Sequence, residues 1–477
     1  MKQNSEGLTA KKEENFTEWF TQLIIKAELA DYSSVSGCIV YRPGSYALWE
    51  KIKQETDKEF KKLGIKNTYF PLFIPESLFD KESEFVKGFS PEVAWVTHGG
   101  NTKLGERLAV RPTSEPIMYE SFSKWIRSWR DLPLLINQWN NVVRWEFNNP
   151  VPFFRGREFL WNELHTCFET EKQALDHGEK VMKAYNKLTE NLMALPGIYG
   201  RKTESEKFAG GVFSKKVHTY LPNGKILEGT CFHHDGQNFS KAYDIKFKDK
   251  NEKDSFVWQN THAITTRMLG GMFAMHSDNK GLVLPPEIAE NKIVIIPLMF
   301  EKDKKVLGEA QEIEKELSKY SPVLDERLEV TPGYKFHEWE LKGIPLRLEL
   351  GPRDLAKKEV ILVKRNTGEK IPTKIKELKT EIPKLLEQIQ KELFDNAKKL
   401  LEQNQRKTED KKELIKFIKE KQMVKVPLCD SPKCEEILKA GTGGAKVLFI
   451  DPESAKNKKC IICGKPAAYW VYVGKTY

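Results

Sequence analysis

The amino-acid sequence predicts three domains, of which the largest belongs to the α+β class. The chain has 477 residues, and domains usually contain about 100–200. Residues 1–285 show short β-like runs and amphipathic helices without a steady alternation of strand and helix, which favours an antiparallel sheet. Residues 286–401 do alternate, as in a small α/β domain, and residues 402–477 hold four clustered cysteines.

The composition is that of a soluble globular protein. Charged residues make up 31% of the chain and hydrophobic residues 39%, and 78 basic against 68 acidic residues give a net charge of +10. This excess is compatible with nucleic acid as a partner but does not require it. The longest apolar run, Ile293–Phe300, is too short to span a membrane. The first residues lack the apolar core of a secretory signal, so we expect a cytoplasmic protein without membrane contact.

Three common motifs for nucleotide or metal binding are absent from the sequence. The triplet Gly474-Lys475-Thr476 is not a P-loop, because no glycine stands five residues before it and no helix follows it. The chain has no G-x-G-x-x-G turn, and His337-Glu338 lacks the second histidine of a zinc-binding helix.

In the first domain, the clearest element is a helix at Ser45–Leu63. Leu48 and Ile52 share one apolar stripe, Ser45 is a candidate N-cap, and Gly64 follows as a stop signal. The other expected elements are an extended run at Asn67–Ile74, a helix at Asp176–Leu195, and two antiparallel strands within Leu134–Phe168 joined by the loop Phe147–Arg157.

The second and third domains differ in pattern. In the second we expect strands at Lys292–Leu298, Leu346–Leu350 and Val360–Arg365, and helices at Glu301–Lys319 and at Pro383–Leu401 with its proline in the first turn. In the third, Gln403–Lys425 is dense in Lys and Glu and is interpreted as a solvated helix. The apolar end Tyr469–Tyr477 is expected to dock rather than fray.

Arginines in three separate segments suggest a site for a nucleoside triphosphate. Arg144 and Glu146 are two residues apart and would share one face of a strand. Arg155–His165 follows in the same stretch of the chain, and the other two arginine-bearing segments are Arg111–Glu115 and Thr265–Arg267. Arginine binds phosphate through planar, multi-donor contacts, and a carboxylate can read a base. Taken alone, an Arg–Glu pair on a strand is more often structural, so the pattern favours this site only weakly.

These segments resemble the signature motifs of class II aminoacyl-tRNA synthetases, and their order resembles the prolyl-tRNA synthetases of the archaeal and eukaryotic-like type. Residues 64–71 resemble motif 1, Arg144–Glu163 resembles motif 2, residues 263–267 resemble motif 3, and residues 333–354 resemble the anticodon-binding domain. The resemblance implies a class II antiparallel-sheet catalytic domain (1–285), an α/β anticodon-binding domain (286–401) and a small zinc-binding-like α+β domain (402–477).

The resemblance also implies the reaction. Such an enzyme activates proline with ATP to prolyl-adenylate and transfers proline to the 3′ end of tRNA(Pro), with Mg²⁺ bridging the phosphates. It implies a homodimer formed through motif 1. Arg144 and Arg267 lie 123 positions apart (267 − 144), which leaves no room for the editing domain that bacterial-type enzymes insert.

Roles in ATP binding follow from the same resemblance. Arg144 would bridge the proline carboxylate and the α-phosphate, Glu146 would hold the 6-amino group of adenine, and Arg155 and Arg267 would bind the outer phosphates. The implied ATP site also includes Glu228, Cys231 and Thr265. Proline's own carboxylate attacks the α-phosphorus, so no side chain need act as nucleophile, and catalysis would rest on positioning and charge neutralisation by Arg144 and Arg267.

The implied proline pocket combines carboxylates with aromatic side chains. Its expected residues are Thr113, Glu115, Arg144, Trp161, Glu163, His165 and His233. Glu115 would receive the imino NH₂⁺ group, and an aromatic wall suits the apolar ring. Relatives often carry a threonine two residues before the histidine that matches His233; Cys231 stands there, and the choice between Thr230 and Cys231 stays open.

Four cysteines near the C-terminus predict a metal site. Cys429 and Cys434 form one pair and Cys460 and Cys463 another, separated by 25 residues (460 − 434 − 1), and such pairs bind Zn²⁺ tetrahedrally. Four thiolates leave no open position, so the expected Zn²⁺ is structural. The alternative is a reduced cluster without metal.

Two further expectations concern RNA and the chain end. In the α/β domain, Glu340 can accept from a guanine edge, while Arg347 and Arg353 can stack on bases or contact phosphate. For each of these residues a surface ion pair is an equal alternative. The Tyr477 carboxylate is expected, from the resemblance, to reach back toward the catalytic domain.

Two rival functions remain at this point. One is a class II synthetase for another small amino acid, which the combination of Trp161, Glu163 and His165 disfavours. The other is a catalytically inactive paralogue that binds RNA. The presence of Arg144, Glu146, Arg155 and Arg267 argues against it, because a binding module does not need all four.

Overall fold

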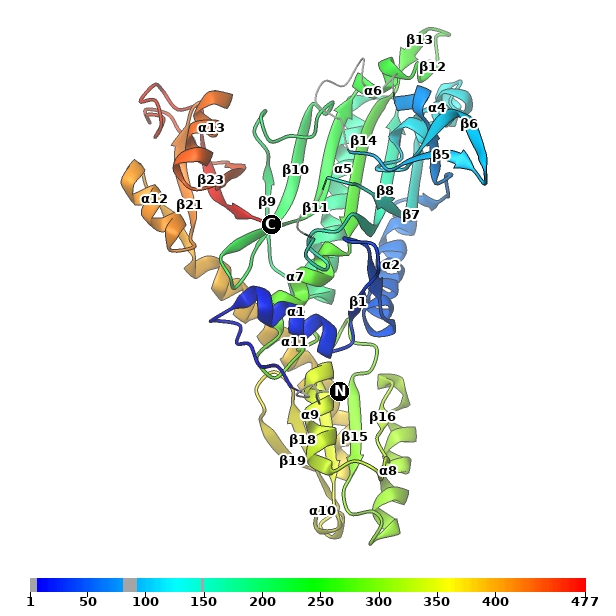
Figure 1. The fold of residues 1–477 in the computed structure, drawn as a ribbon, viewed down its shortest axis with the longest axis vertical. Coiled ribbons are helices and arrows are strands. Elements are labelled where there is room, and N and C mark those ends of the chain that lie inside the picture. Colours follow the sequence, from blue (N-terminus) through cyan, green and yellow to red (C-terminus); the bar gives the residue numbers. More distant parts are fainter. Residues whose placement is uncertain (1–6, 80–91, 147–149) are drawn as a thin grey trace.

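The protein consists of three joined bodies. The structure is a computed structural model that describes residues 7–79, 92–146 and 150–477. Figure 1 shows a large α+β body in the upper part, an α/β body below it, and a smaller C-terminal body beside the large one. The predicted fold class is confirmed. No helix within the described ranges is both long and apolar enough to cross a membrane.

One sheet of eleven strands runs through two of the three bodies, in the order β20-β21-β23-β22-β9-β10-β11-β14-β8-β7-β3. Its strands in the large body are β3 (Lys66–Asn67), β7 (Leu134–Val143), β8 (Glu158–Phe168), β9 (Ile198–Arg201), β10 (Phe213–Tyr220), β11 (Lys225–Gly236) and β14 (Trp258–Thr265). All pair antiparallel except β3 with β7. The expected pair within Leu134–Phe168 is β7 with β8; residues 147–149 of its connecting loop lie outside the described residues.

Helices cover one face of this sheet. They are α1 (Phe16–Lys26), α2 (Pro43–Lys62), α5 (Glu171–Lys187) and α7 (Arg267–His276). They bury one large apolar core against the sheet, to which Leu23, Ile52, Tyr185 and Phe273 belong. Because side chains alternate along a strand, the opposite face of the same strands is left for other contacts.

Smaller elements surround the large body. They are β1 (Ala30–Tyr32), β2 (Ile39–Tyr41), β4 (Phe73–Pro75), β5 (Trp95–Gly99), β6 (Thr102–Val110), α4 (Glu115–Trp125), α6 (Asn238–Ala242), β12 (Lys246–Lys248) and β13 (Asp254–Phe256). Strands β4, β6 and β5 form a separate three-stranded sheet. The first turn of α4 carries Glu115, which places this residue close to the open face of the main sheet.

The α/β body holds a five-stranded sheet, ordered β16-β15-β17-β18-β19. Its elements are β15 (Ile293–Pro297), α8 (Lys304–Glu316), β16 (Val323–Leu324), α9 (Pro332–Lys342), β17 (Leu346–Leu350), α10 (Pro352–Ala356), β18 (Glu359–Lys364), β19 (Lys370–Lys374) and α11 (Leu378–Gln403). Ile293 and Ile295 face the core with α8 and α11, whereas Val294 and Ile296 face α9. Burial on both faces explains why β15 is continuously apolar.

The C-terminal body extends the main sheet. It consists of β20 (Gln405–Lys407), α12 (Lys411–Lys419), β21 (Met423–Leu428), α13 (Pro432–Gly441), β22 (Lys446–Asp451) and β23 (Tyr469–Thr476). Strand β22 pairs with β9, and the end of β23 pairs in parallel with β11 through Lys475 and Thr476. The expected docking of the apolar C-terminal segment is therefore confirmed.

Four details of the predicted elements were wrong. The helix at Pro43–Lys62 begins before Ser45, whose buried hydroxyl donates to the Leu29 carbonyl instead of capping it. Helix α5 ends at Lys187 and a π-helical turn follows. Pro383 lies inside α11, whose first turn starts at Leu378. The charged stretch Gln403–Lys425 is not one helix, since it contains β20, α12 and the start of β21. In each case tertiary contacts outweigh a local signal.

Candidate active site

A cavity of about 340 Å³ lies on the open face of the main sheet. Side chains from β8, β10, β11, β14 and the first turn of α7 line it, together with the segments before α4 and after β9. The predicted site residues that line it are Thr113, Glu115, Arg144, Trp161, Glu163, His165, Glu228, Cys231, His233, Thr265 and Arg267. One cavity thus collects residues from five separate segments of the sequence.

One end of the cavity is built by β8. Trp161, Glu163 and His165 are two residues apart on this strand and therefore project from the same face. The Glu163 carboxylate accepts hydrogen bonds from the Ser114 amide (2.9 Å), the Ser114 hydroxyl (2.7 Å) and the Asn140 side chain (2.7 Å). This network fixes the carboxylate at the floor of the cavity.

The same end carries negative charge. Burial alone would raise the pKa of Glu163, but the neighbouring His165 and the donors Asn140 and Ser114 hold that pKa below its ordinary value. Thr113 donates a hydrogen bond to Glu115, and ligand atoms of Glu115, Glu163 and His165 all lie within 4.8 Å of one another. A compact pair of carboxylates beside aromatic rings can hold a small organic cation.

A β-bulge places Glu228 and Cys231 on the same face of β11. Lys216 pairs with Cys231 and His218 pairs with Glu228, so three steps on β11 match two on β10. Such a bulge turns side chains an odd number of residues apart to one side. Cys231 lines the cavity, whereas Thr230 is fully buried outside it. The geometry thus favours Cys231 where the sequence left the choice open.

Two lysines bind Glu228 at the other end of the cavity. Lys202 Nζ lies 2.7 Å and Lys216 Nζ 2.8 Å from its two carboxylate oxygens, and the Lys202 side chain is only 1% exposed. Burial would raise the pKa of Glu228, but the two lysines hold it well below its ordinary value. Two cations against one anion leave this end electropositive.

Arg144 and Arg267 add to this positive charge. Arg144 Nε donates to the Pro112 carbonyl at 3.0 Å, and its guanidinium lies 5.4 Å from the Trp161 ring centroid. Arg267 Nε donates to the Phe154 carbonyl at 3.1 Å. Burial and then the nearby charge of Arg144 lower the pKa of Arg267, although Glu228 opposes the shift. A site that crowds these cations is suited to an anion of several charges.

His233 stands between the two ends as a neutral side chain. Burial, followed by the charge of Lys216, lowers the pKa of His233 to about 3. Its Nδ1 lies 2.6 Å from the Ser214 hydroxyl, and the Phe208 ring lies 4.8 Å from its own. The imidazole is therefore held in place by one polar and one aromatic neighbour.

Two predicted residues lie outside the cavity. Glu146 is exposed in a turn after β7, so the expectation that it shares a strand face with Arg144 was wrong: the strand ends at Val143. Arg155 is exposed too, although its charge still contributes to lowering the pKa of Arg267. Both flank residues 147–149, which lie outside the described residues.

Sequence reasoning missed several residues of the cavity. Lys216 lines the cavity because β10 pairs with β11. Lys202, which follows β9, acts on the site indirectly, because it donates a hydrogen bond to the lining residue Glu228. Glu206, Lys207 and Phe208 form part of the wall. Lysines and aromatic residues are common on strands and loops, so nothing local marks these five; only the strand order brings them to the site.

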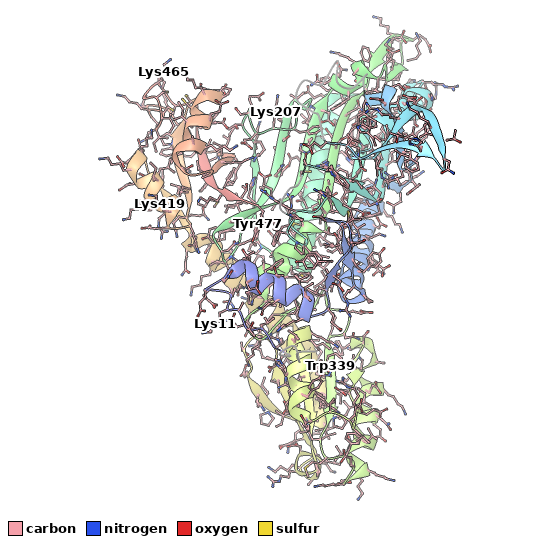
Figure 2. The ribbon with its side chains drawn as sticks, in the orientation of Figure 1. Lys11, Lys207, Trp339, Lys419, Lys465 and Tyr477 are labelled. Carbon is pink, nitrogen blue, oxygen red and sulfur yellow. The ribbon has the colours of Figure 1, made fainter. Side chains whose placement is uncertain are left out.

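The last residue of the chain contacts the motif-2 region. The Tyr477 ring stacks on the Phe154 ring at 3.9 Å with an interplanar angle of 2°, and its hydroxyl accepts from Asn223 at 2.7 Å. Figure 2 labels Tyr477 where the C-terminal segment meets the large body. Since the Phe154 carbonyl also holds Arg267, the C-terminal segment borders the cavity.

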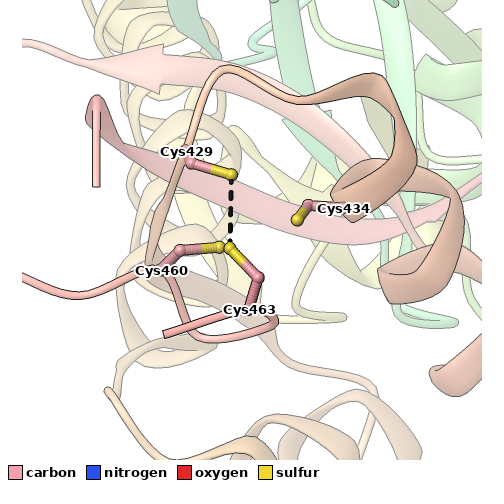
Figure 3. A group of neighbouring side chains, drawn as sticks. All are labelled: Cys429, Cys434, Cys460 and Cys463. Atoms are coloured by element: carbon pink, nitrogen blue, oxygen red, sulfur yellow. Dashed lines mark hydrogen bonds between the residues drawn. The ribbon is translucent and has the colours of Figure 1, made fainter. Parts of the chain in front are cut away.

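The four predicted metal ligands converge in the C-terminal body. Sulfur atoms of Cys429, Cys434, Cys460 and Cys463 all lie within 4.8 Å of one another, as Figure 3 shows, and Cys429 and Cys463 are 3.8 Å apart. Burial would raise the pKa of Cys460, but hydrogen bonds from Cys463 and Cys429 lower it to about 7. Four thiols around one point form a donor set that fits tetrahedral Zn²⁺.

The three predicted anticodon residues are not together. Arg347 Nη1 lies 3.3 Å from Glu340 Oε1, and Arg347 Nε lies 2.9 Å from Glu349. Arg353 is exposed in α10, past the far end of β17. Glu340 and Arg347 thus form part of one ion-pair cluster, whereas helix α10, which carries Arg353, lies at the lower tip of this body in Figure 1.

Comparisons with known proteins agree with this geometry. Residues 96–276 match a profile described as tRNA synthetase class II core domain (G, H, P, S and T), residues 292–385 match one described as anticodon binding domain, and residues 411–477 match one described as prolyl-tRNA synthetase, C-terminal.

Individual relatives match over nearly the whole chain. Proline–tRNA ligase 2 of Bacillus cereus is 45% identical over 98% of both chains. The cytoplasmic proline–tRNA ligase of Arabidopsis thaliana is 41% identical over 100% of this chain and 92% of that protein. A crystal structure of prolyl-tRNA synthetase from Cryptosporidium parvum, complexed with halofuginone and AMPPNP, superposes with a TM-score of 0.94 at 40% identity, over 99% of this chain and 98% of that one.

Proposed function

Because this chain belongs to the prolyl-tRNA synthetases of class II, we propose that the cavity on the open face of its main sheet is where proline and ATP react. The reaction of the family is activation of proline with ATP to prolyl-adenylate and transfer of proline to the 3′ end of tRNA(Pro). Between Arg144 and Arg267 the described residues form only strands and helices of the large body, without an inserted editing domain.

The observation that carries the proposal is the opposite charge at the two ends of one cavity. Glu115 and Glu163 supply an anionic end, whereas Arg267 and Lys216 line a cationic end, to which Lys202 adds its charge through Glu228. Proline bears a cationic nitrogen and an anionic carboxylate, and ATP bears a polyphosphate. This polarity orients the two substrates with their reacting groups toward each other.

The anionic end is the proposed proline subsite. Glu115 receives the imino NH₂⁺ group, and Glu163 and His165 shape the floor beneath it. Trp161 supplies an apolar wall for the ring, with Phe159 beside it at a centroid distance of 5.8 Å. Thr113 and His233 complete the subsite. A pocket of this kind excludes amino acids with larger side chains because they do not fit. It binds acyclic amino acids more weakly because they lack the contacts that the proline ring makes with the aromatic wall.

The cationic end is the proposed ATP subsite. Arg144 stands between the ends, where it neutralises charge on both the proline carboxylate and the α-phosphate. Arg267, with Arg155 from the neighbouring loop, binds the outer phosphates, while Glu228, Cys231 and Thr265 line the wall. Glu146 reads adenine from its turn beside the cavity. No nucleophilic side chain is required, because these groups lower the barrier by positioning and electrostatic stabilisation.

Mg²⁺ belongs to this proposal as the ion that accompanies ATP. Both carboxylate oxygens of Glu228 accept from lysines, so in this arrangement the residue balances Lys202 and Lys216 instead of offering a vacant cation site. Phosphate oxygens are the ligands that Mg²⁺ prefers, and the ion neutralises their charge.

The four-cysteine cluster is the proposed structural zinc site. Cys429, Cys434, Cys460 and Cys463 would hold Zn²⁺, which would lock the loop after β21, the first turn of α13 and the loop before β23 together. Its chemistry would be limited to this cross-link, since four thiolates fill the coordination sphere.

The proposed domain limits are 1–285 for catalysis, 286–401 for the anticodon and 402–477 for the zinc-binding-like domain. Glu340, Arg347 and Arg353 are proposed to contact the anticodon stem-loop of tRNA(Pro). We further propose a cytoplasmic homodimer. Tyr69, 69% exposed, lies in the segment that resembles motif 1, and Phe73, 45% exposed, follows it; both suit such an interface.

ATP–pyrophosphate exchange with each of the twenty amino acids, without tRNA, tests the activity. We expect exchange with proline far above alanine and cysteine. Arg144→Ala should abolish exchange, because it removes the cation between the substrates, yet leave tRNA binding largely intact. Lys172→Ala, which removes an exposed lysine that does not line the cavity, is the control. Equal loss of exchange and tRNA binding in Arg144→Ala would contradict this assignment.

A further inference from the structure

The C-terminal body contacts one wall of the active site through a buried hydrogen bond. Thr203 Oγ1 donates to Glu435 Oε2 at 3.0 Å, and the two residues are 1% and 9% exposed. Glu435 lies in the first turn of α13, directly after Cys434. Thr203 begins the segment 203–208 that follows β9 and ends in the cavity wall.

This segment is held at both ends. At its start, Lys202 donates a hydrogen bond to Glu228, which lines the cavity. The Thr203 carbonyl accepts from the amides of Glu206 and Lys207, which makes a turn. At its end, the Phe208 ring lies against His233 and the Phe208 amide donates to Ser214 at 2.8 Å. The position of Thr203 therefore determines the position of the cavity wall that Glu206, Lys207 and Phe208 form.

A second contact joins the same two regions. Lys446 Nζ of β22 lies 3.7 Å from Glu206 Oε2, and Glu206 lines the cavity. Just before the segment, Arg201 of β9 pairs with Ile450 of β22. In Figure 2, Lys207 is labelled on the side of the large body that faces the C-terminal body.

From these contacts we propose that Glu435 is a positioning residue for proline activation: by accepting the Thr203 hydrogen bond, it holds segment 203–208 so that Phe208 keeps His233 in place within the proline subsite. Glu435 touches no substrate. Its carboxylate is buried, and a buried hydrogen bond to a carboxylate is stronger and more directional than an exposed one. The proposal rests on the proposed function, because it concerns the proline subsite.

The test is a set of variants assayed by ATP–pyrophosphate exchange. Thr203→Val removes the donor while keeping the shape of the side chain, and Thr203→Ser keeps the donor. We expect the KM for proline to rise roughly tenfold in Thr203→Val, with kcat changed much less, and to return toward wild type in Thr203→Ser. Glu435→Ala should raise this KM at least as much as Thr203→Val, because it also removes a contact with Ser205. Glu435→Gln keeps an acceptor oxygen, so its KM should lie between those of wild type and Glu435→Ala.

The matched control is Glu436→Ala, which removes an exposed carboxylate from the same turn of α13. The double variant Thr203→Val/Glu435→Ala should have the same KM for proline as Glu435→Ala, because that single variant already removes the acceptor of the Thr203 hydroxyl. Zinc content and thermal unfolding are measured on every variant. They distinguish a displacement of segment 203–208 from unfolding of the C-terminal body.

Two results would overturn the inference. One is a proline KM in Thr203→Val and Glu435→Ala equal to that of Glu436→Ala. The other is a loss confined to kcat that follows the melting temperature and that Thr203→Ser does not restore. If the wild-type protein is active, either result rejects only the positioning role of Glu435. If the wild-type protein shows no proline-dependent exchange, the proposed function itself is rejected.

Discussion

The α/β body and the C-terminal body join the catalytic body in different ways. The C-terminal body shares its sheet: β22 pairs with β9, and β23 pairs with β11. At that seam Gly200 is required, since a Cβ there would lie 2.4 Å from the Phe449 ring. The α/β body shares no sheet with the catalytic body among the described residues.

Side chains and a short backbone contact join the α/β body instead. Arg365 donates two hydrogen bonds to Asp278, at 2.7 and 2.8 Å, and the Leu282 amide donates to the Leu341 carbonyl at 3.0 Å. Helix α11 starts in the α/β core with Leu378 and reaches the catalytic core with Ala397. A shared sheet makes one cooperative unit, whereas an ion pair and one helix permit independent behaviour.

The largest expected effect comes from the proposed zinc site at the four clustered cysteines. Removing Zn²⁺ with a chelator, or Cys460→Ser, should unfold the C-terminal body and reduce proline-dependent exchange at least tenfold, because β22 and β23 support the catalytic strands. Binding of an isolated anticodon stem-loop should persist. Zinc content measures the loss of the metal, thermal unfolding measures the stability of the C-terminal body, and ATP–pyrophosphate exchange measures the activity.

Cys38→Ser is the control for this experiment, since Cys38 lies outside the cluster. Full exchange activity in a zinc-free protein with a melted C-terminal body would show that the shared sheet does not couple the two.

The second-largest effect is expected from acid, which should lower the free energy of unfolding of the catalytic body. Burial lowers the pKa of His177 and His276 to about 4 and of His218 and His233 to about 3. The unfolded chain protonates these groups near pH 6.5, so their contribution to stability is complete above pH 6.5 and falls as the pH drops toward 4.

The expected slope is on the order of 1 kcal/mol per pH unit for each of these histidines. Burial raises the pKa of Asp235 well above its ordinary value, so the folded state holds a proton that the unfolded chain has lost. This contribution has the opposite slope and cancels that of one histidine. Urea unfolding at pH 7, 6 and 5 measures the change. A free energy of unfolding that does not change across this range would contradict the burial of uncharged histidines.

The smallest effect is expected at the ion pair between bodies. Arg365→Ala should lower tRNA aminoacylation roughly tenfold and leave proline-dependent exchange within about twofold, because it loosens the α/β body without touching the cavity. Lys374→Ala, which breaks a pair with Glu359 inside that body, is the control. An equal fall of exchange and aminoacylation would mean that this junction also supports catalysis.

Much of the candidate site could be predicted from the sequence, but not its cationic end. Residues two apart on one strand, such as Trp161, Glu163 and His165, share a face by the pleat alone. Lys202 and Lys216 reach the site only through the order of β9, β10 and β11. Glu146 illustrates the opposite error, because an alternating pattern does not show where a strand ends.

By itself, the sequence determined the pairing of β7 with β8, the end of helix α2 before Gly64, and the four cysteines as one cluster. These features depend on residue spacing and on local backbone preference. The tertiary structure decided the rest: the bulge that turns Glu228 and Cys231 to one side, the Thr203–Glu435 hydrogen bond, and the sheet shared by two bodies. Contacts between residues hundreds of positions apart depend on strand order, and no local spacing encodes strand order.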